Sequence, residues 1–322
     1  MTHNSRELLK LDGLSVEYRI RGGYLSAVKN VSMDIGRGEI FAIVGESGCG
    51  KSTIAHSIMR LLPDKNERIS GGIYFEGENL GAYSDNQMTA VRGKRIGMIF
   101  QNPLDSLNPV YRSGTQVAEA IFLDKKDRAI VWKEVIDLYR EMKMPDPDQR
   151  VRSFPHELSG GMRQRVMIAM MLARNPKLLI ADEPTTALDV TVEAQILEIM
   201  SRLRADFNTS ILLITHNFGI VAEIADRVAV MYAGELAEQG SVFDIFQSPS
   251  HPYTELLMKA LPHQSKRAGR LQTIEGSVPR ITSTSPGCRF YNRCPIASGH
   301  CENHDPPVRR LGDSHSYACH NR

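Results

Sequence analysis

The chain has 322 residues, of which 42% are hydrophobic and 24% charged, and its net charge is +2 at pH 7. This is an ordinary globular composition, long enough for one large domain or two, and the charge is too small to indicate a nucleic-acid-binding surface. The N-terminus lacks the apolar segment of a secretory signal, and no run approaches the roughly 20 apolar residues of a membrane-spanning helix. We therefore expect a reducing compartment, no disulfides among the five cysteines, and at most a peripheral contact with a membrane.

Two half-buried strands are predicted near the N-terminus, over residues 8–20 and 28–35, because apolar and polar residues alternate there. A glycine pair marks the turn between them. Tyr18 ends the first strand, where its ring either stacks on a nucleotide base or packs on the core. A buried strand predicted over residues 39–44 leads into the main motif of the chain.

A phosphate-binding loop is predicted directly after this strand, from a match to G-x-x-x-x-G-K-[ST]. The loop and the threonine after it are Gly45, Glu46, Ser47, Gly48, Cys49, Gly50, Lys51, Ser52 and Thr53. In such a loop backbone N–H groups surround phosphate oxygens, and the helix predicted over 53–62 adds the positive end of its dipole. Lys51 is expected to reach the β- and γ-phosphates, and Ser52 to bind Mg²⁺. The alternative is a glycine-rich turn without a ligand.

Three further buried strands end in polar side chains: 96–100 at Gln101, 177–181 at Asp182 and Glu183, and 210–214 at His216. In open α/β sheets, ligands bind at the carboxyl ends of the strands. Asp182 suits a Mg²⁺ ion, and Glu183 suits the polarisation of an attacking water. His216 is a candidate contact to the γ-phosphate, and Gln101 a candidate to orient water or metal. Each residue alone has a structural alternative, but the set favours a Mg-nucleotide site.

Helical patterns occupy the rest of the chain. Residues 103–157 read as a helical insertion into the α/β core, and Ser159 is a candidate N-cap for a helix that ends at Leu172. The remaining predicted elements are a strand at 73–76, a helix at 191–205, a hairpin at 227–239, and helices at 241–247 and 252–260. Residues 262–287 are rich in Ser, Thr, Arg, Gly and Pro and read as a linker.

These motifs resemble, in kind and in order, the ATP-binding subunits of ABC transporters. They are GESGCGKS, the glutamine loop from Gln101, the signature LSGGM, the strand LLIADEP, the loop ALD, and His216. The resemblance covers about residues 7–260. Within the family, QNPLDSLNP, SPSHPYTELLMKALP and the ending GCRFYNRCPIA resemble the oligopeptide/dipeptide importer branch.

The resemblance implies a role for each residue of the site. Tyr18 stacks on adenine, Glu183 is the general base and His216 senses the γ-phosphate. Lys51 binds phosphate, while Ser52, Gln101 and Asp182 hold Mg²⁺. Four more residues join the cofactor-binding set, and the first three of them contact ATP bound to a partner subunit: Ser159, Gly160, Gly161 and Asp189.

The implied fold is α/β, a P-loop NTPase core of the ABC type with N-terminal antiparallel strands. Residues 1–262 form the ATP-binding domain, a helical subdomain is inserted at about 103–175, and residues 263–322 form a small cysteine-containing extension. The implied partners are a second ATP-binding subunit, more readily a paralogue than a second copy, two transmembrane permease subunits, and an extracytoplasmic substrate-binding protein acting through them. The implied place is the cytoplasmic face of the membrane.

Four cysteines of the extension have a spacing that suits a soft metal: Cys288, Cys294, Cys301 and Cys319. Pro295 follows one of them, as in some ferredoxins. Some members of the branch carry an iron–sulfur cluster at such cysteines, so we expect [4Fe-4S], with zinc as the second choice and unliganded thiols as the third.

The expected function is hydrolysis of ATP to power the import of dipeptides or oligopeptides. Related branches import nickel or oligosaccharides with similar ATPases, and the sequence does not distinguish the cargo. A different class, a soluble ABC ATPase acting on nucleic acid, ranks far lower because the chain has one cassette and no basic stripe. A catalytically inactive regulatory cassette also ranks low because Lys51, Asp182, Glu183 and His216 are all present.

Overall fold

The computed structural model describes residues 7–62, 67–101, 107–123, 127–186, 188–260, 274–279, 281–282, 285–312 and 314–322. The predicted helix stop at Pro63, residues 102–106 after the glutamine, Ala187 and residues 261–273 of the predicted linker lie outside these ranges. The chain forms two compact units: the first comprises residues 1–36, 40–82 and 214–322, and the second residues 37–39 and 83–213.

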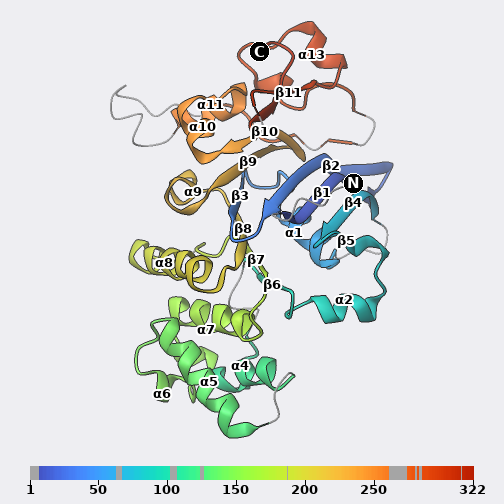
Figure 1. Cartoon of the computed structure of the whole chain (residues 1–322). Helices are drawn as coiled ribbons and strands as arrows, with labels where there is room; N and C mark the ends of the chain where they lie inside the picture. Colours follow the sequence, from blue (N-terminus) through green and yellow to red (C-terminus); the bar gives the residue numbers. More distant parts are fainter. Residues whose placement is uncertain are drawn as a thin grey trace. The chain divides into compact units, whose positions relative to one another are not determined.

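The first unit contains an antiparallel sheet of the order β2-β1-β4-β5 (Figure 1). Its strands are β1 (Glu7–Ile20), β2 (Gly23–Gly36), β4 (Arg68–Phe75) and β5 (Glu78–Asn79). The β1–β2 hairpin confirms the predicted N-terminal pair, and Tyr18 lies opposite Leu25 in its register. Alternate side chains of β1 are buried because one face of the sheet covers the core.

The first unit also contains strands in the order β11-β12-β10-β9-β3. Strand β3 (Ile40–Val44) is buried at every residue and pairs in parallel with β9 (Arg227–Tyr232), which forms a hairpin with β10 (Glu235–Ser241). The helices of this unit are α1 (Lys51–Met59), α9 (Phe218–Ile224), α10 (Val242–Gln247) and α11 (Pro252–Lys259), with a 3-10 turn η1 at Leu80–Ala82. Helix α1 begins two residues before the predicted start, and it ends early because Arg60 adopts a left-handed conformation.

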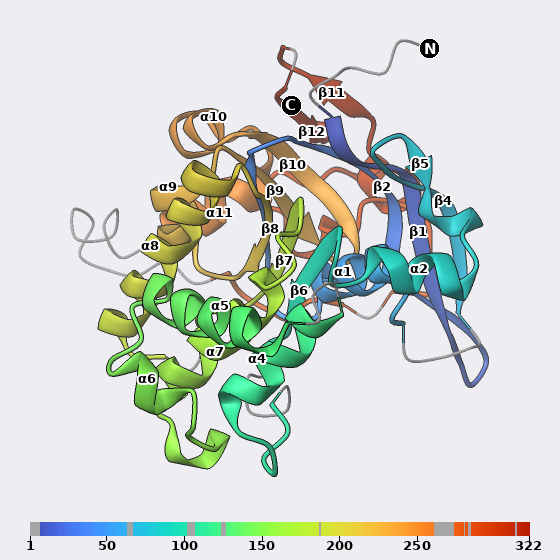
Figure 2. The same ribbon diagram turned by 60° about the horizontal axis from the view of Figure 1, so that its bottom comes forward.

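The second unit contains strands β6 (Ile96–Ile99), β7 (Leu178–Asp182) and most of β8 (Ser210–Thr215), in the order β8-β7-β6. Its helices are α2 (Asp85–Val91), α4 (Ser113–Phe122), α5 (Arg128–Glu141), α6 (Pro147–Arg150), α7 (Gly160–Leu172) and α8 (Val190–Phe207), with a 3-10 turn η2 at Pro155–Glu157. Helices α4, α5 and α7 pack on one another (Figure 2). Arg165 of α7 ties the group together by donating to the carbonyls of Met142 and Lys143 at the end of α5.

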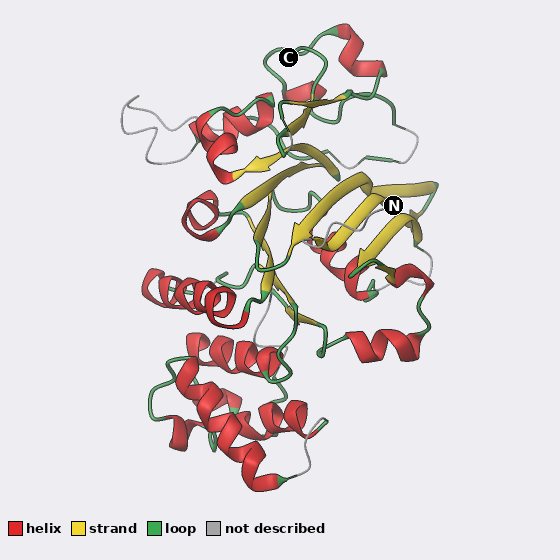
Figure 3. Cartoon of the chain, viewed as in Figure 1, coloured by secondary structure: helices red, strands yellow, loops and turns green. Residues whose placement is uncertain are grey.

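The cysteine-containing end of the chain consists mainly of loops with short elements (Figure 3). These are η3 (Tyr291–Arg293), α13 (Gly299–Asn303), β11 (Val308–Arg310) and β12 (Ser316–Ala318). The end is part of the first unit, because β12 pairs with β10 at Tyr317 and Glu238 and the segment around Thr282 bridges to Leu25 of β2. Among the described helices, none combines the length and the apolar character needed to cross a membrane.

Candidate nucleotide site

The predicted phosphate loop connects the end of β3 to the first turn of α1, as the motif requires. Gly45 and Gly50 are glycines for lack of room, since a Cβ would lie 2.2 Å from the Met231 carbonyl at Gly45 and 2.4 Å from the Ala27 carbonyl at Gly50. Both also have positive φ angles, of 155° and 102°. Gly48 differs, because a Cβ there would meet nothing within 4 Å. The loop is thus packed tightly at its two ends and open at its centre, which suits a phosphate group.

Lys51 is buried, at 5% exposed, and its ammonium group lies inside the loop. The ammonium donates to the carbonyls of Gly45 at 2.8 Å and Glu46 at 3.1 Å. The first hydrogen bond of the α1 ladder runs from the Ile54 N–H to the Gly50 carbonyl, so the N–H groups of Lys51, Ser52 and Thr53 precede the ladder. An ammonium group and a helix N-terminus therefore meet at the loop, as anion binding requires.

Cys49 fills the inside of the loop, with its side chain 1% exposed. A Cβ on Gly45 would lie 2.8 Å from the Cys49 sulfur, so the thiol occupies the space beside that glycine. Burial raises the pKa of the Cys49 thiol, while the nearby Lys51 ammonium acts in the opposite direction. Its burial beside Gly45 indicates a packing role for the side chain.

Tyr18 is connected to the loop through strand β2. Its register partner Leu25 is two residues from Ala27, whose carbonyl touches Gly50. Tyr18 is half-buried, which leaves part of its ring accessible. The stacking of Tyr18 on a base stays a prediction.

The second unit brings Glu183 and Gln101 together. The Gln101 side-chain amide donates to Glu183 Oε2 at 3.1 Å, and the Thr186 hydroxyl donates to the same oxygen at 2.9 Å. Asp182, the last residue of β7, is 2% exposed, whereas Glu183 is half-buried. Glu183 has a φ of 47°, a strained conformation for a residue with a side chain, of the kind that concentrates at functional sites.

The signature segment lies at the N-terminus of α7 in the second unit. Ser159 caps the helix by accepting from the Met162 N–H at 3.3 Å, as predicted, and it is exposed together with Gly160. Gly161 is buried against α8, where a Cβ would lie 2.5 Å from Val192 Cγ1. Asp189 caps α8 by accepting from the Val192 N–H at 2.9 Å, so the structure gives this residue a capping role.

His216 follows β8 directly and is exposed. Its neighbours are structural: Thr215 is buried, and Asn217 caps α9 by accepting from the Gly219 N–H at 2.9 Å. The histidine therefore sits on a short, well-anchored connection between a buried strand and a helix.

The four cysteines of the extension lie near enough to affect one another's pKa. Cys288 donates its backbone N–H to the Cys301 carbonyl at 2.8 Å, and the Ser298 hydroxyl and the Asn321 amide contact the Cys301 sulfur. Burial raises the pKa of Cys288 to about 11, with smaller effects in the same direction from Cys301 and Cys294. Burial likewise raises the pKa of Cys294, and Cys319 and Cys301 add to it. Across the described part of the chain, however, no three His, Cys, Asp or Glu side chains are grouped so as to hold a metal ion.

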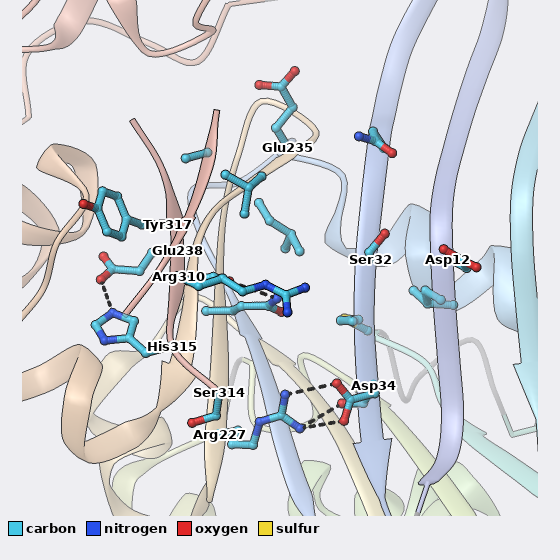
Figure 4. Close-up of a pocket in the computed structure, with 18 of the residues that line it drawn as sticks. Asp12, Ser32, Asp34, Arg227, Glu235, Glu238, Arg310, Ser314, His315 and Tyr317 are labelled. Atoms are coloured by element: carbon cyan, nitrogen blue, oxygen red, sulfur yellow. Dashed lines mark hydrogen bonds and ion pairs between the residues drawn. The ribbon is translucent and has the colours of Figure 1, made fainter. Parts of the chain in front are cut away.

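A cavity of about 670 Å³ in the first unit lies apart from the loop, and its described lining contains no residue of the predicted nucleotide site (Figure 4). It is lined by strands β1, β2, β9 and β10 and by the segment 305–318. Two side-chain pairs lie in it, Arg227 with Asp34 at 3.0 Å and His315 with Glu238 at 2.8 Å. The first pair joins β9 to β2, and the second joins β10 to the residue just before β12.

Comparisons with known proteins agree with this geometry. Residues 28–186 match the family model "ABC transporter", and residues 237–301 match "Oligopeptide/dipeptide transporter, C-terminal region". The dipeptide transport ATP-binding protein DppD of Bacillus subtilis is 45% identical over 315 residues, which cover 97% of this chain and 94% of that protein. The chain belongs to the ABC transporter ATP-binding proteins. As a member of this family it is an ATPase subunit coupled to transport, as predicted.

Further comparisons place the chain in a branch of the ABC family. The oligopeptide transport ATP-binding protein OppD of Bacillus subtilis is 46% identical over 311 residues, 96% of this chain and 87% of that protein. Among solved structures, the dimeric ATP-binding cassette MJ0796 bound to ADP and phosphate is similar with a TM-score of 0.66 and 26% identity, covering 73% of this chain and 99% of that one. The predicted ABC-type P-loop fold and the predicted peptide-importer branch are thereby confirmed.

One contact of this ABC cassette was missed in the sequence. Arg293 forms an ion pair with Glu46 of the phosphate loop, with Nη1 and Oε2 2.6 Å apart. The two residues are 247 positions apart in the chain, so no local pattern could have linked them. The one available signal was that an arginine stands next to one of the four clustered cysteines.

Proposed function

We propose that this chain hydrolyses ATP to power the import of dipeptides or oligopeptides across the cytoplasmic membrane. The observation that carries the proposal is the phosphate loop, tightly packed at Gly45 and Gly50, open at Gly48 and holding a buried Lys51. The cargo class is supported by the match at residues 237–301 and by relatives named for dipeptide and oligopeptide transport. Nickel and oligosaccharides remain the alternative cargoes for an ATPase of this kind.

The proposed chemistry is an in-line attack of water on the γ-phosphorus of ATP. Lys51 binds the β- and γ-phosphates, and Tyr18 stacks on the adenine. Glu183 takes the proton of the water as its oxygen bonds to phosphorus and the bond to ADP breaks. The hydrogen bonds from Gln101 and Thr186 to Glu183 Oε2 support this role, because they fix the direction of the carboxylate.

Mg²⁺ would be held by Ser52, Asp182 and Gln101. The chemistry of the donor set fits, since a hydroxyl, a carboxylate and an amide oxygen are all hard ligands. When bound, the ion neutralises charge that develops on the phosphates. His216, exposed at the end of β8, is proposed to contact the γ-phosphate.

We further infer that two cassettes pair head to tail, so that the signature of one contacts ATP on the other. Exposure of Ser159 and Gly160 at the N-terminus of α7 supports this, because a capped helix start that is open to solvent suits an anion. A similar cassette, MJ0796, is dimeric. The partner is proposed to be a paralogue, and the pair to sit on two permease subunits at the cytoplasmic face, with an external binding protein delivering the peptide.

Two substitutions test the catalytic proposal. Glu183→Gln should bind ATP as tightly as the wild type but hydrolyse it at least about 100-fold more slowly, because the general base is lost. Lys51→Ala should lose ATP binding itself. Binding of a fluorescent ATP analogue and release of phosphate, both measured on the purified chain with its partner subunits, separate the two effects.

The control for this pair is Glu193→Gln, which changes a carboxylate of α8 in the same unit and should leave turnover unchanged. Near-normal hydrolysis by Glu183→Gln would remove Glu183 as the base. Tight ATP binding by Lys51→Ala would overturn the assignment of the loop.

We propose that the cysteine group holds a [4Fe-4S] cluster with a structural role. Support comes from the spacing of Cys288, Cys294, Cys301 and Cys319 in the sequence and from two side chains, Ser298 and Asn321, that hydrogen-bond the Cys301 sulfur. The four thiols would have to move closer together to hold the cluster, because their described positions form no metal-binding group. Donors to sulfur are among the features that tune such clusters. A bound cluster would supply cross-links to a segment too short to form a core of its own.

Metal analysis of the anaerobically purified chain tests this proposal. We expect about four irons and four sulfides per chain, in keeping with a cubane held by four thiolates. Cys301→Ser should lose most of the iron, whereas Cys49→Ser, the matched control in the phosphate loop, should keep it. One zinc per chain, or no metal, would contradict the cluster.

A further inference from the structure

The phosphate loop carries a carboxylate at its second position, and the C-terminal extension supplies its partner. Arg293 donates two parallel hydrogen bonds to Glu46, from Nη1 to Oε2 at 2.6 Å and from Nη2 to Oε1 at 3.0 Å. The arginine side chain is 6% exposed and the glutamate 29%. A two-pronged pair shielded from water on one side is stronger and more directional than an ordinary surface ion pair.

The position of Arg293 is fixed by contacts that do not involve Glu46. Its Nε donates to the Glu275 carbonyl at 2.8 Å, its Nη2 to the Ile274 carbonyl at 3.3 Å, and its Nη1 to the Tyr232 hydroxyl at 3.3 Å. The guanidinium carbon also lies 5.6 Å from the centre of the Tyr232 ring. Because these bonds hold the guanidinium in place, little side-chain entropy is lost when it binds the carboxylate.

The backbone of Glu46 is also held by a residue outside the loop. Its N–H donates to the Tyr253 hydroxyl at 3.2 Å, and Tyr253 packs in an aromatic group with Tyr232 and Phe290. Phe290 belongs to the extension, three residues before Arg293. The second residue of the loop is therefore clamped at both its side chain and its backbone, by groups outside the loop.

The carboxylate of Glu46 sits on a loop whose proposed ligand carries several negative charges. An unpaired carboxylate there would repel the phosphates, and it would also be able to turn toward the buried Lys51 ammonium. The ion pair with Arg293 prevents both effects.

We propose that Arg293 is a positioning residue for ATP binding, which acts by holding and neutralising Glu46 and so couples the cysteine-containing extension to the phosphate loop. The inference rests on the proposed role of residues 45–53 as the phosphate loop. It adds a residue from the far end of the chain to the nucleotide site and gives the extension a function in the ATPase.

Affinity for ATP in four forms of the full chain tests the proposal: the wild type, Arg293→Ala, Glu46→Gln and the double variant. Arg293→Ala should raise the Kd for a fluorescent ATP analogue by about tenfold, the effect expected when a charged hydrogen-bond partner is removed. Glu46→Gln should bind near the wild-type level. The double variant should recover most of the affinity, because no uncompensated carboxylate remains.

This recovery separates positioning from mere structural support. If Arg293 served only to hold the extension through Ile274 and Glu275, a change at Glu46 could not restore ATP binding. Arg293→Lys, which keeps the charge but not the two-pronged geometry, should fall between the wild type and Arg293→Ala. Arg310→Ala, an exposed arginine of the same extension, is the matched control and should leave the Kd unchanged.

The proposal is overturned if Arg293→Ala and Arg293→Lys both bind ATP as tightly as the wild type, or if the double variant shows no recovery. Loss of the phosphate-loop assignment is a separate result, recognised by tight ATP binding in Lys51→Ala. Should Arg293→Ala fail to fold, as judged by its thermal unfolding transition, Arg293→Lys alone and Arg293→Lys combined with Glu46→Gln carry the comparison.

Discussion

At the level of single residues, steric contacts explain why certain motif positions must be glycine. The match to the phosphate-loop pattern requires glycine at positions 45 and 50, and the structure supplies the reason, two backbone carbonyls from distant strands. The two signature glycines differ from each other in how closely they are packed. Gly160 faces open surroundings, whereas Gly161 is pressed against Val192. One motif thus contains a glycine required for packing beside one that is not.

Gly161→Ala should destabilise the chain by about 1–2 kcal/mol, because the added methyl group would overlap Val192 and force α7 away from α8. Urea denaturation of the full-length variant measures the change. Val192→Ala combined with Gly161→Ala should recover stability by removing the obstructing methyl groups.

Gly160→Ala is the matched control, since its Cβ would meet only Leu188 at 3.9 Å and alanine favours a helix. Its stability should equal or exceed that of the wild type. Equal stability of Gly161→Ala and Gly160→Ala would show that the close contact with Val192 has no energetic consequence.

At the level of helices and strands, most elements were predicted from their patterns, and those that were missed are short. The predicted strands at 39–44 and 210–214 and the helix ending at Leu172 correspond to β3, β8 and α7. Helix α9, of seven residues, and strands β11 and β12, of three residues each, were not predicted. Such short segments contain less than two periods of a pattern. Strands β11 and β12 form because each pairs with a neighbouring strand.

Helix α11 shows how a neighbouring segment affects the stability of a helix. Its N-cap is His251, whose Nδ1 accepts from the Tyr253 N–H at 3.1 Å. The ring is 4% exposed and contacts Phe290 of the extension. Burial lowers the pKa of His251 from 6.5 to about 4, with a smaller opposing effect from a hydrogen bond to Ala318.

This depressed pKa predicts a loss of stability in acid. The unfolded chain binds a proton at His251 below about pH 6.5 and the folded chain only near pH 4, so stability is full above pH 6.5 and falls as the pH is lowered. The loss from this group reaches about 3 kcal/mol by pH 4. Thermal unfolding of the wild type and of His251→Asn between pH 4 and 7.5 measures it.

Asparagine keeps the capping acceptor but does not titrate, so the His251→Asn variant should show a shallower decline in melting temperature over this range. His156→Asn, at an exposed histidine of η2, is the control. Parallel pH profiles for the wild type and His251→Asn would rule out His251 as a source of the acid sensitivity.

At the level of the whole chain, the cysteine-containing end is part of the first unit. It adds strand β12 to β10, buries His315 against Glu238, and reaches the phosphate loop through Arg293. The division into an ATP-binding domain at 1–262 and an extension at 263–322 stays a prediction. The contacts nevertheless give the extension a defined place beside the loop.

Those parts of the site that are contiguous in the chain were accessible from the residues alone. A phosphate loop, a capped helix start and two carboxylates after a strand each lie within about one turn or strand. The types of the neighbouring residues therefore indicate their chemistry. The pairing of Gln101 with Glu183, the contact of Gly161 with Val192, and the clamp of Arg293 on Glu46 were not accessible. They join residues distant in sequence, and their partners are set by how strands and helices pack, which no local periodicity encodes.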